Sequence, residues 1–150
     1  MTESPTGTPD TTAKQPSVLF VCSKNGGKSQ IAAGLMNQLA AGAVTVYSAG
    51  IKPGRELNSE SVASLLELGV DIAGEHPKPV TDELLDAVDV VVVLGTEAKL
   101  EPHGTARFEA WETEEPSTRG IEGMERMRLL RDDIKTRVEA LFAELAGSKD

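Results

Sequence analysis

The sequence predicts a three-layer α/β fold of flavodoxin-like type, in which helices cover both faces of a parallel four-stranded sheet. Two patterns support this prediction. Short apolar runs alternate with segments of helical periodicity along the whole chain. The runs at residues 17–21 and 88–94 are almost continuously apolar, as is typical of parallel strands that are buried on both faces. A length of 150 residues with 39% hydrophobic content suits one domain with one core.

The first strand is expected at residues 17–21, after a segment that contains almost no apolar side chains. A helix follows from Lys28, because apolar residues recur at helical spacing until Gly42, which is expected to end it. The second strand is expected over "AVTVYS", residues 43–48. The order strand, helix, strand indicates one parallel crossover unit.

The next segment predicts a second helix over "SESVASLLEL", residues 59–68. Either Asn58 or Ser59 can cap its start, and Gly69 ends it. The prolines of "HPKPV" then favour extended backbone at residues 76–80, because a residue before proline avoids the helical region. Thr81 is expected to cap a short helix over "DELLDA".

The third strand, residues 88–94, has the strongest buried-strand pattern in the chain. A polar, turn-rich region from residue 95 to about 121 is expected to hold the short fourth strand at residues 106–110. The closing helix is expected from about residue 122 to about 146, with methionine and leucine along one apolar face. We therefore expect a disordered tail at residues 1–16 and a single domain at residues 17–150.

Composition excludes several classes of function. The net charge is −9, so the chain has no basic surplus with which to bind nucleic acid or an anionic membrane. The N-terminal residues lack the basic start and apolar stretch of a signal peptide, which favours the cytoplasm. The two histidines, His76 and His103, have no metal-ligand spacing around them, so no metal site is expected.

The chemistry is expected in "CSKNGGKSQ", residues 22–30, which contains the only cysteine of the chain. This loop joins the first strand to a helix N-terminus, where backbone N–H groups and the helix dipole favour an anion. Glycines allow close wrapping of the backbone, and Lys28 adds a cation. Helix N-termini and lysines also favour the thiolate form of a cysteine. The oxyanion-binding residues predicted here are Ser23, Lys24, Asn25, Gly26, Gly27, Lys28 and Ser29, with Cys22 as nucleophile.

The loop allows two other interpretations. Cys22 alone could be a small buried side chain at a strand end, but the Gly-Gly-Lys-Ser that follows favours a functional thiol. A nucleotide-binding P-loop also ends in Gly-Lys-Ser, but it requires glycine where this chain has Cys22. We therefore set aside the nucleotide-binding interpretation.

Cys22, five intervening residues, Lys28 and Ser29 together resemble the C-x5-R-S loop of the low-molecular-weight protein tyrosine phosphatase family. The arsenate reductase branch of that family is also similar in "VLFVC", in "SQ" after the cation and in "SAG" at residues 48–50. The resemblance extends from about residue 17 to the last helix. It implies the family fold and places Glu115-Pro116 where the family carries its Asp-Pro general acid, with Glu112 and Glu114 as rivals.

Three departures from the family pattern bear on mechanism. Lys28 replaces the arginine, so the two-pronged grip on a tetrahedral anion is lost. Glu115 carries its carboxyl on a longer arm than aspartate. The two further cysteines of the thioredoxin-coupled reductases are missing, so the chain cannot form the internal disulfide that would supply two electrons.

The sequence is most similar to actinobacterial arsenate-mycothiol transferases, in "CxxNGGKSQ" and "EPSxRGIEGMERMR". The resemblance implies an arsenate reductase with Cys22 as nucleophile, Lys28 as anion ligand and Glu115 as general acid. Mycothiol would be the co-substrate, with mycoredoxin acting downstream and no bound cofactor; glutathione with glutaredoxin would meet the same need. The alternatives are a phosphatase with a phosphocysteine intermediate, disfavoured by 3% aromatic content, and a non-catalytic oxyanion-binding module.

Overall fold

A computed structural model of the chain describes residues 15–95, 98–101, 104–113 and 116–147. Most of the expected N-terminal tail, residues 1–14, lies outside this description. Four strands form one sheet in the order β2-β1-β3-β4, and every neighbouring pair is parallel. The predicted fold class is therefore confirmed.

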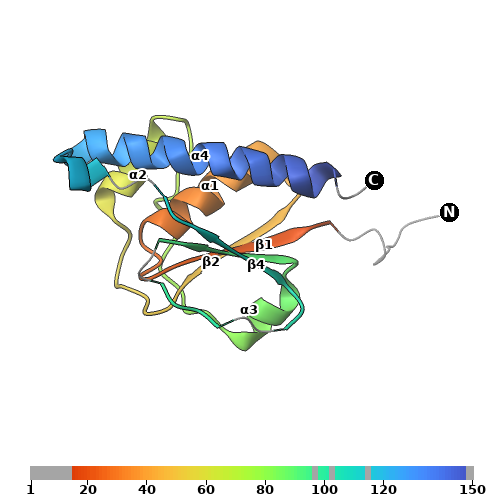
Figure 1. Ribbon diagram of the computed structural model, residues 1–150. Helices are drawn as coiled ribbons and strands as arrows, with labels where there is room; N and C mark the ends of the chain where they lie inside the picture. Colours follow the sequence, from red (N-terminus) through yellow and green to blue (C-terminus); the bar gives the residue numbers. More distant parts are fainter. Residues whose placement is uncertain (1–14, 96–97, 102–103, 114–115, 148–150) are drawn as a thin grey trace.

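The elements follow one another in the order that the sequence predicts, with one short 3-10 helix in addition. They are β1 (Ser17–Cys22), α1 (Lys28–Ala40), β2 (Thr45–Gly50), α2 (Ser59–Leu66), α3 (Asp82–Ala87), β3 (Val90–Leu94), β4 (Arg107–Trp111), the 3-10 helix η2 (Pro116–Arg119) and α4 (Gly123–Gly147). The helices α1, α2 and α4 cover one face of the sheet and α3 covers the other, which gives three layers (Figure 1).

The predicted caps are present at two helices. Asn58, rather than Ser59, caps α2, because its side chain accepts a hydrogen bond from the backbone N–H of Ser61. Thr81 caps α3 in the same way through the N–H of Leu84. Helix α1 ends at Ala40, before Gly42, because Ala41 already adopts the left-handed conformation with φ of 49°.

Strand β2 lies two residues later than the apolar pattern indicates. Its register is set by β1, since Thr45 lies opposite Ser17 and Gly50 lies opposite Cys22. Ala49 and Gly50 therefore belong to the strand, although the apolar pattern ends at Ser48. This extension brings Gly50 beside the loop that follows β1.

The core lies on both faces of the sheet, because successive side chains of β1 and β3 point to opposite sides. Val18 and Phe20 of β1 pack in the cluster under α1, α2 and α4, whereas Leu19 and Val21 pack in the cluster near α3. Full burial of each such side chain contributes about 1.5–3 kcal/mol. By the same alternation Cys22 lies on the face that α1 covers.

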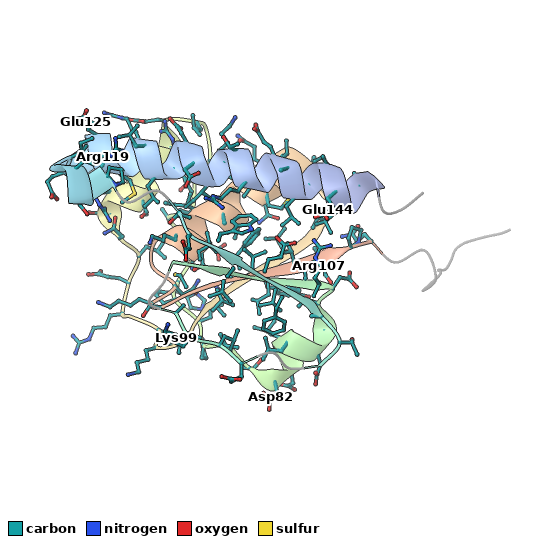
Figure 2. All side chains as sticks on the ribbon, viewed as in Figure 1. Asp82, Lys99, Arg107, Arg119, Glu125 and Glu144 are labelled. Atoms are coloured by element: carbon teal, nitrogen blue, oxygen red, sulfur yellow. The ribbon has the colours of Figure 1, made fainter. Side chains whose placement is uncertain are left out.

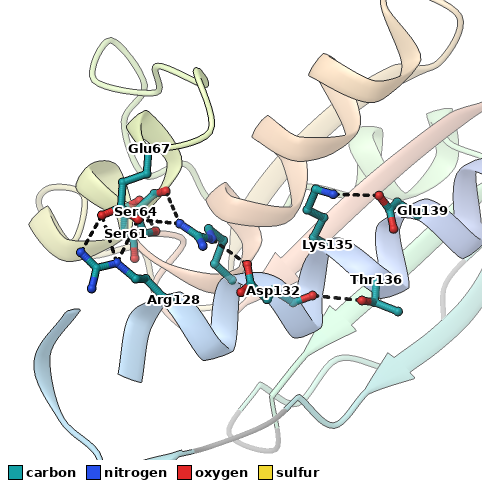
Figure 3. A network of polar contacts seen from close by, with 9 residues as sticks. Ser61, Ser64, Glu67, Arg128, Asp132, Lys135, Thr136 and Glu139 are labelled. Carbon is teal, nitrogen blue, oxygen red and sulfur yellow. Dashed lines mark hydrogen bonds and ion pairs between the residues drawn. The ribbon is translucent and has the colours of Figure 1, made fainter. Parts of the chain in front are cut away.

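Helices α2 and α4 are joined by an ion-pair network that we call the Glu67 clamp (Figure 3). Glu67 accepts three hydrogen bonds from the guanidinium of Arg128, at 2.7, 3.0 and 3.0 Å, and one from Arg131 at 2.8 Å. The Arg128 hydrogen bonds, followed by those of Arg131, lower the pKa of Glu67 to about 2. Arg131 is buried, and besides Glu67 it binds the carbonyl of Ser64 at 2.8 Å and the carboxylate of Asp132 at 2.9 Å.

Within the described part of the chain, none of the helices combines the length and the apolar character that crossing a membrane requires.

Candidate active site

The loop from Cys22 to Lys28 joins the carboxyl end of β1 to the first residue of α1. The carboxyl ends of parallel strands are the usual place for a ligand site in such folds. Helix α1 has no acidic residue in its first turn, and its first N–H groups have no acceptor within the helix. The loop therefore leads into a helix end that favours negative charge.

The carbonyl groups of the loop are all engaged by donors outside it. Four of these carbonyls accept hydrogen bonds from backbone N–H groups of the segment 51–58, at 2.7–3.1 Å. The pairs are Cys22 with Ile51, Ser23 with Lys52, Lys24 with Gly54, and Gly26 with Asn58. The carbonyl of Asn25 accepts from the Gln30 side chain at 3.2 Å, and that of Gly27 from the N–H of Ile31 at 2.9 Å.

This arrangement fixes the direction of the amides. In a trans peptide the N–H points opposite to the preceding carbonyl, and no cis peptide is present in the described chain. Because six consecutive carbonyls point outward, the N–H groups of residues 23–28 point to the inner side of the loop. One of them, the N–H of Asn25, donates to the sulfur of Cys22 at 3.2 Å. The loop is thus a ring of donors around the thiol.

The hydroxyl of Ser29 is also directed at the thiol, with Oγ 2.9 Å from the sulfur of Cys22. The backbone N–H of Lys78, which can only donate, contacts one atom of the Asn25 side-chain amide at 2.8 Å, so that atom is the oxygen Oδ1. The other atom of the amide, which faces Ser29, is therefore the nitrogen. That nitrogen donates to Ser29 Oγ at 2.7 Å. The proton of Ser29 is therefore directed at the sulfur of Cys22.

Gln30 and the segment 76–79 brace the loop from behind. Gln30 is 1% exposed, and its amide donates to the carbonyl and Oδ1 of Asn25, each at 3.2 Å, and to the carbonyl of His76 at 3.3 Å. Asn25 has a φ of 56°, a left-handed conformation that asparagine adopts more readily than most residues. The brace holds this conformation in a fully buried residue.

Close packing of the loop excludes a side chain at Gly50 and crowds one at Gly26. A Cβ on Gly50 would lie 2.9 Å from the backbone N of Asn25 and 2.9 Å from the carbonyl carbon of Lys24, so no larger residue fits. A Cβ on Gly26 would lie 3.0 Å from the carbonyl oxygen of Glu56. At Gly27 a Cβ would meet only the Ser61 hydroxyl at an ordinary 3.6 Å, so that glycine is not needed for space.

Cys22 opens onto a pocket of about 820 Å³. We call the side formed by residues 22–28 the loop wall and the side formed by residues 112–113, after β4, the β4 wall. The rest is lined by residues 54–56, Asn58, Ser61, Leu94, Gly95, and Arg126, Met127 and Leu130 of α4. Lys28 extends towards the end of β3, where a Cβ on Gly95 would lie 3.1 Å from its Nζ. The loop wall and its surroundings thus place Lys24, Lys28, Arg55 and Arg126 on one pocket of an acidic chain.

The β4 wall brings Glu112 and Thr113 to the same pocket. The predicted general acid, Glu115, and its rival Glu114 lie outside the described residues. Thr113 Oγ1 is shielded from solvent and has no hydrogen-bond partner, and within the described residues it is the one buried side-chain oxygen or nitrogen in that condition. A buried polar group without a partner costs about 1–3 kcal/mol and calls for an explanation.

Arg107, Arg119 and Trp111 are not among the residues that line the pocket. Arg107 begins β4, at the end of the strand opposite the site, and forms ion pairs with Glu109 and Glu144 at 2.6 and 2.8 Å. Figure 2 shows Arg107 and Glu144 together near the C-terminal end of α4, with Arg119 near its N-terminal end. Trp111 is buried and packs against Phe20, with ring centroids 5.9 Å apart. His103 lies outside the described residues.

Several pocket residues were not identified from the sequence. Arg55 stands in no quoted motif, and Arg126 stands in the stretch "EPSxRGIEGMERMR", which gave it no role. Gln30 and Gly50 do stand in the stretches "SQ" and "SAG", which pointed to them without giving a role. A smaller hollow of about 450 Å³ beside α1 and β2 contains none of the predicted site residues.

Comparison with known proteins identifies the family to which this chain is similar. Residues 17–150 match the model of the family described as low molecular weight phosphotyrosine protein phosphatase. The chain is 34% identical over 132 residues to a glutaredoxin arsenate reductase of Synechocystis sp., covering 86% of this chain and 98% of that protein. The solved structure of an arsenate reductase in the phosphate binding state superposes with a TM-score of 0.76 and 34% identity, over 87% of this chain and 99% of that one.

A thioredoxin-dependent arsenate reductase of Corynebacterium glutamicum superposes with a TM-score of 0.74 and 30% identity over 89% of this chain. The match covers only 63% of that solved chain. Fold, loop geometry and family match agree over the whole described domain. This chain belongs to the low molecular weight phosphotyrosine protein phosphatase family.

Proposed function

We propose that this protein is an arsenate reductase in which Cys22 attacks arsenate and an external thiol completes the reduction. The observation that carries the proposal is the ring of inward N–H groups around a buried thiol in a chain with one cysteine. Such a ring binds a tetrahedral oxyanion and presents the sulfur to its central atom. Relatives with 34% and 30% identity that are named arsenate reductases support arsenate as the substrate.

In the first step the Cys22 thiolate attacks the arsenic of arsenate. A sulfur–arsenic bond forms, an arsenic–oxygen bond breaks, and the departing hydroxide takes a proton and leaves as water. Arsenic remains arsenic(V) in this step. The amides of Ser23, Lys24 and residues 26–28 and the ammonium of Lys28 bind the oxygens, while the Asn25 N–H and the Ser29 hydroxyl stabilise the sulfur.

The next steps need thiols from outside the chain. A low-molecular-weight thiolate displaces Cys22 from arsenic, which gives a thiol–arsenate conjugate and free enzyme. A second thiol then attacks the sulfur of the conjugate and forms a disulfide, and the electron pair of the sulfur–arsenic bond stays on arsenic as arsenite. The disulfide formed outside the protein therefore balances the two electrons that arsenic gains.

Mycothiol is our preferred thiol, with mycoredoxin as the protein that attacks the conjugate. The support is the resemblance of residues 22–30 and of the η2–α4 segment to arsenate-mycothiol transferases. Glutathione with glutaredoxin is the alternative, and a relative named glutaredoxin arsenate reductase supports it. The pocket volume of about 820 Å³ is in the range that holds a small organic molecule, whereas an oxyanion alone needs far less. The expected location of this chemistry is the cytoplasm, where thiols stay reduced.

Glu115 is our proposed general acid for the leaving hydroxide, on the basis of its place in the family pattern. General acid help of this kind is worth about 10²–10⁴ in rate. Glu112 is the described carboxylate on the β4 wall and is therefore the rival to test. Replacing each by glutamine in turn identifies the acid by which variant loses more kcat.

A phosphatase is the second candidate, because the family model that matches is that of a phosphotyrosine phosphatase. Its phosphocysteine intermediate would use the same loop, and water would replace the external thiol. A third possibility is an oxyanion-binding module without turnover. In that case the loop would bind phosphate or arsenate and Cys22 would form no product.

One set of assays separates the three. The protein is incubated with arsenate and mycothiol–mycoredoxin, with arsenate and glutathione–glutaredoxin, and with p-nitrophenyl phosphate. Arsenite formed in either thiol system supports the reductase and identifies the thiol. Nitrophenol without arsenite supports the phosphatase, and binding of phosphate without either product supports the module.

A further inference from the structure

Thr113 lines the pocket that holds Cys22, and its hydroxyl is shielded from solvent and has no hydrogen-bond partner. Thr113 follows β4, the last strand of the sheet, and so comes from a segment more than 80 residues away from the loop wall. Native proteins pair almost all of their buried polar side chains. Because Thr113 lines a ligand pocket, a rotation about χ1 that turns this unpaired hydroxyl towards the pocket would let a bound ligand become its partner.

The surroundings identify the class of that ligand as an oxyanion. The loop carbonyls are turned away, the inner side of the loop presents N–H groups, and Lys28 and Arg126 line the same pocket. Lys28 offers a compact ammonium in place of a planar fork, so the oxygens of a tetrahedral anion need further donors. A threonine hydroxyl donates strongly to a charged oxygen, and rotation about χ1 redirects it.

We propose that Thr113 is an oxyanion-binding residue, whose hydroxyl donates a hydrogen bond to an oxygen of the anion held at Cys22. The bound anion thereby supplies the acceptor that the free protein lacks. This inference rests on the proposed function, because it assumes that the loop binds the substrate anion. It adds a ligand from the β4 wall to the donors of the loop wall.

The test compares Thr113→Val, which keeps the shape and loses the hydroxyl, with Thr113→Ser, which keeps the hydroxyl. Inorganic phosphate is titrated as a protectant of Cys22 against iodoacetamide in the full chain. The phosphate concentration for half-protection should rise about 10- to 100-fold in Thr113→Val, the range expected for a lost bond to a charged group. Thr113→Ser should stay within about threefold of the parent.

The matched control is Thr136→Val, since Thr136 is an exposed threonine of α4 whose hydroxyl donates to the carbonyl of Asp132 at 3.1 Å. It should bind phosphate like the parent. The Tm of Thr113→Val should equal or exceed that of the parent, because the deleted hydroxyl had no partner to lose. A hydroxyl with a structural role would lower the Tm instead.

The proposal is overturned if Thr113→Val binds phosphate as well as the parent, if Thr113→Ser loses as much affinity as Thr113→Val, or if the Tm of Thr113→Val falls. A parent that phosphate does not protect also overturns it. The arsenite assay is separate from this one. A parent that binds phosphate but forms no arsenite contradicts the proposed reductase and leaves the Thr113 comparison valid.

Discussion

On the loop wall, each carbonyl from Cys22 to Gly27 has a donor, and the buried side chains of Asn25 and Ser29 are paired. The β4 wall differs, because Thr113 carries a buried hydroxyl that has no partner within the described residues. Full pairing makes the loop wall preorganised for an anion before any arrives. On the β4 wall, by contrast, we propose that the Thr113 hydroxyl gains a partner only when the anion binds. We infer that affinity for the anion depends on the loop wall and on the contacts that the β4 wall makes to the bound anion.

Removing the nucleophile should have the largest effect on arsenite formation and should leave the structure of both walls unchanged. Cys22→Ser should form no measurable arsenite in the thiol system that supports the parent, because serine cannot form the sulfur–arsenic bond. Its Tm should lie close to that of the parent, since serine accepts the same bonds from Asn25 and Ser29. Arsenite formation by this variant at the parental rate would contradict the role of Cys22.

Displacing the loop wall should have the next largest effect. Gly50→Ala would bring a Cβ within 2.9 Å of the backbone of Lys24 and Asn25, which must shift. A shift of about 1 Å in a catalytic group can lower kcat/KM about 10²-fold, and overpacking of this kind costs about 1–3 kcal/mol of stability. The measurements are arsenate-dependent kcat/KM and urea unfolding.

Gly74→Ala is the matched control for Gly50→Ala. A Cβ on Gly74 would meet nothing within 4 Å, so activity and stability should stay near those of the parent. Parental kcat/KM in Gly50→Ala would show that the loop wall tolerates displacement and that its preorganisation matters less than we infer.

Removing the hydrogen bonds of Gln30 behind the loop wall should have a moderate effect on stability and on kcat/KM. Gln30→Met keeps much of the volume but removes the donors to the Asn25 carbonyl and to the carbonyl of His76. Acceptors left buried without donors cost about 1–3 kcal/mol, and loosening Asn25 should lower kcat/KM about tenfold. Urea unfolding and steady-state kinetics measure the two effects.

Gln38→Met is the control on the same helix, because Gln38 is exposed and donates to the carbonyl of Leu68 at 3.1 Å. It should change stability by no more than about 0.5 kcal/mol and leave activity unchanged. Equal losses in the two variants would mean that burial of Gln30 contributes nothing specific to the loop.

The sequence predicted the fold because its signals are local. The apolar runs at 17–21 and 88–94 can be buried only as central parallel strands, and both are. Asn58 and Thr81 cap helices by bonds to residues three positions away, which a local pattern can indicate. The shift of β2 by two residues could not be predicted, because pairing with β1 determines its limits.

The candidate site divides in the same way. The loop wall is contiguous in sequence, so residues 22–29 could be proposed together from one motif. The other residues reach the site only through the crossover connections of the sheet. Gly50 and Lys78 hold the loop, and Thr113 and Arg126 line the pocket. No pattern within a single segment encodes such a meeting. Glu115 stays a prediction, since it lies outside the described residues.

The smallest effect is expected at the Glu67 clamp, which joins α2 to α4 and includes none of the residues of either wall. The pKa of Glu67 is lowered from 4.5 to about 2 by its bonds to Arg128 and Arg131. A carboxyl whose folded pKa is lowered stabilises the fold above its unfolded pKa and loses that contribution as the pH falls through the folded value. Glu67→Gln should therefore lower the Tm slightly at pH 7, and the gap to the parent should close as the pH falls from 4.5 to about 2.

The clamp variant also tests the comparison of the two walls, because it weakens the fold without touching the pocket. The kcat/KM of Glu67→Gln at neutral pH should equal that of the parent, since the Glu67 side chain is 37% exposed and solvent screens its charge. Glu139→Gln, which removes an exposed i,i+4 pair with Lys135, is the control and should leave the Tm unchanged at every pH. A Tm gap for Glu67→Gln that stays constant down to pH 2 would mean that the loss is one of packing rather than of charge. A large fall in its kcat/KM would mean that the position of α2 governs the loop wall through the bond from the Asn58 N–H to the Gly26 carbonyl.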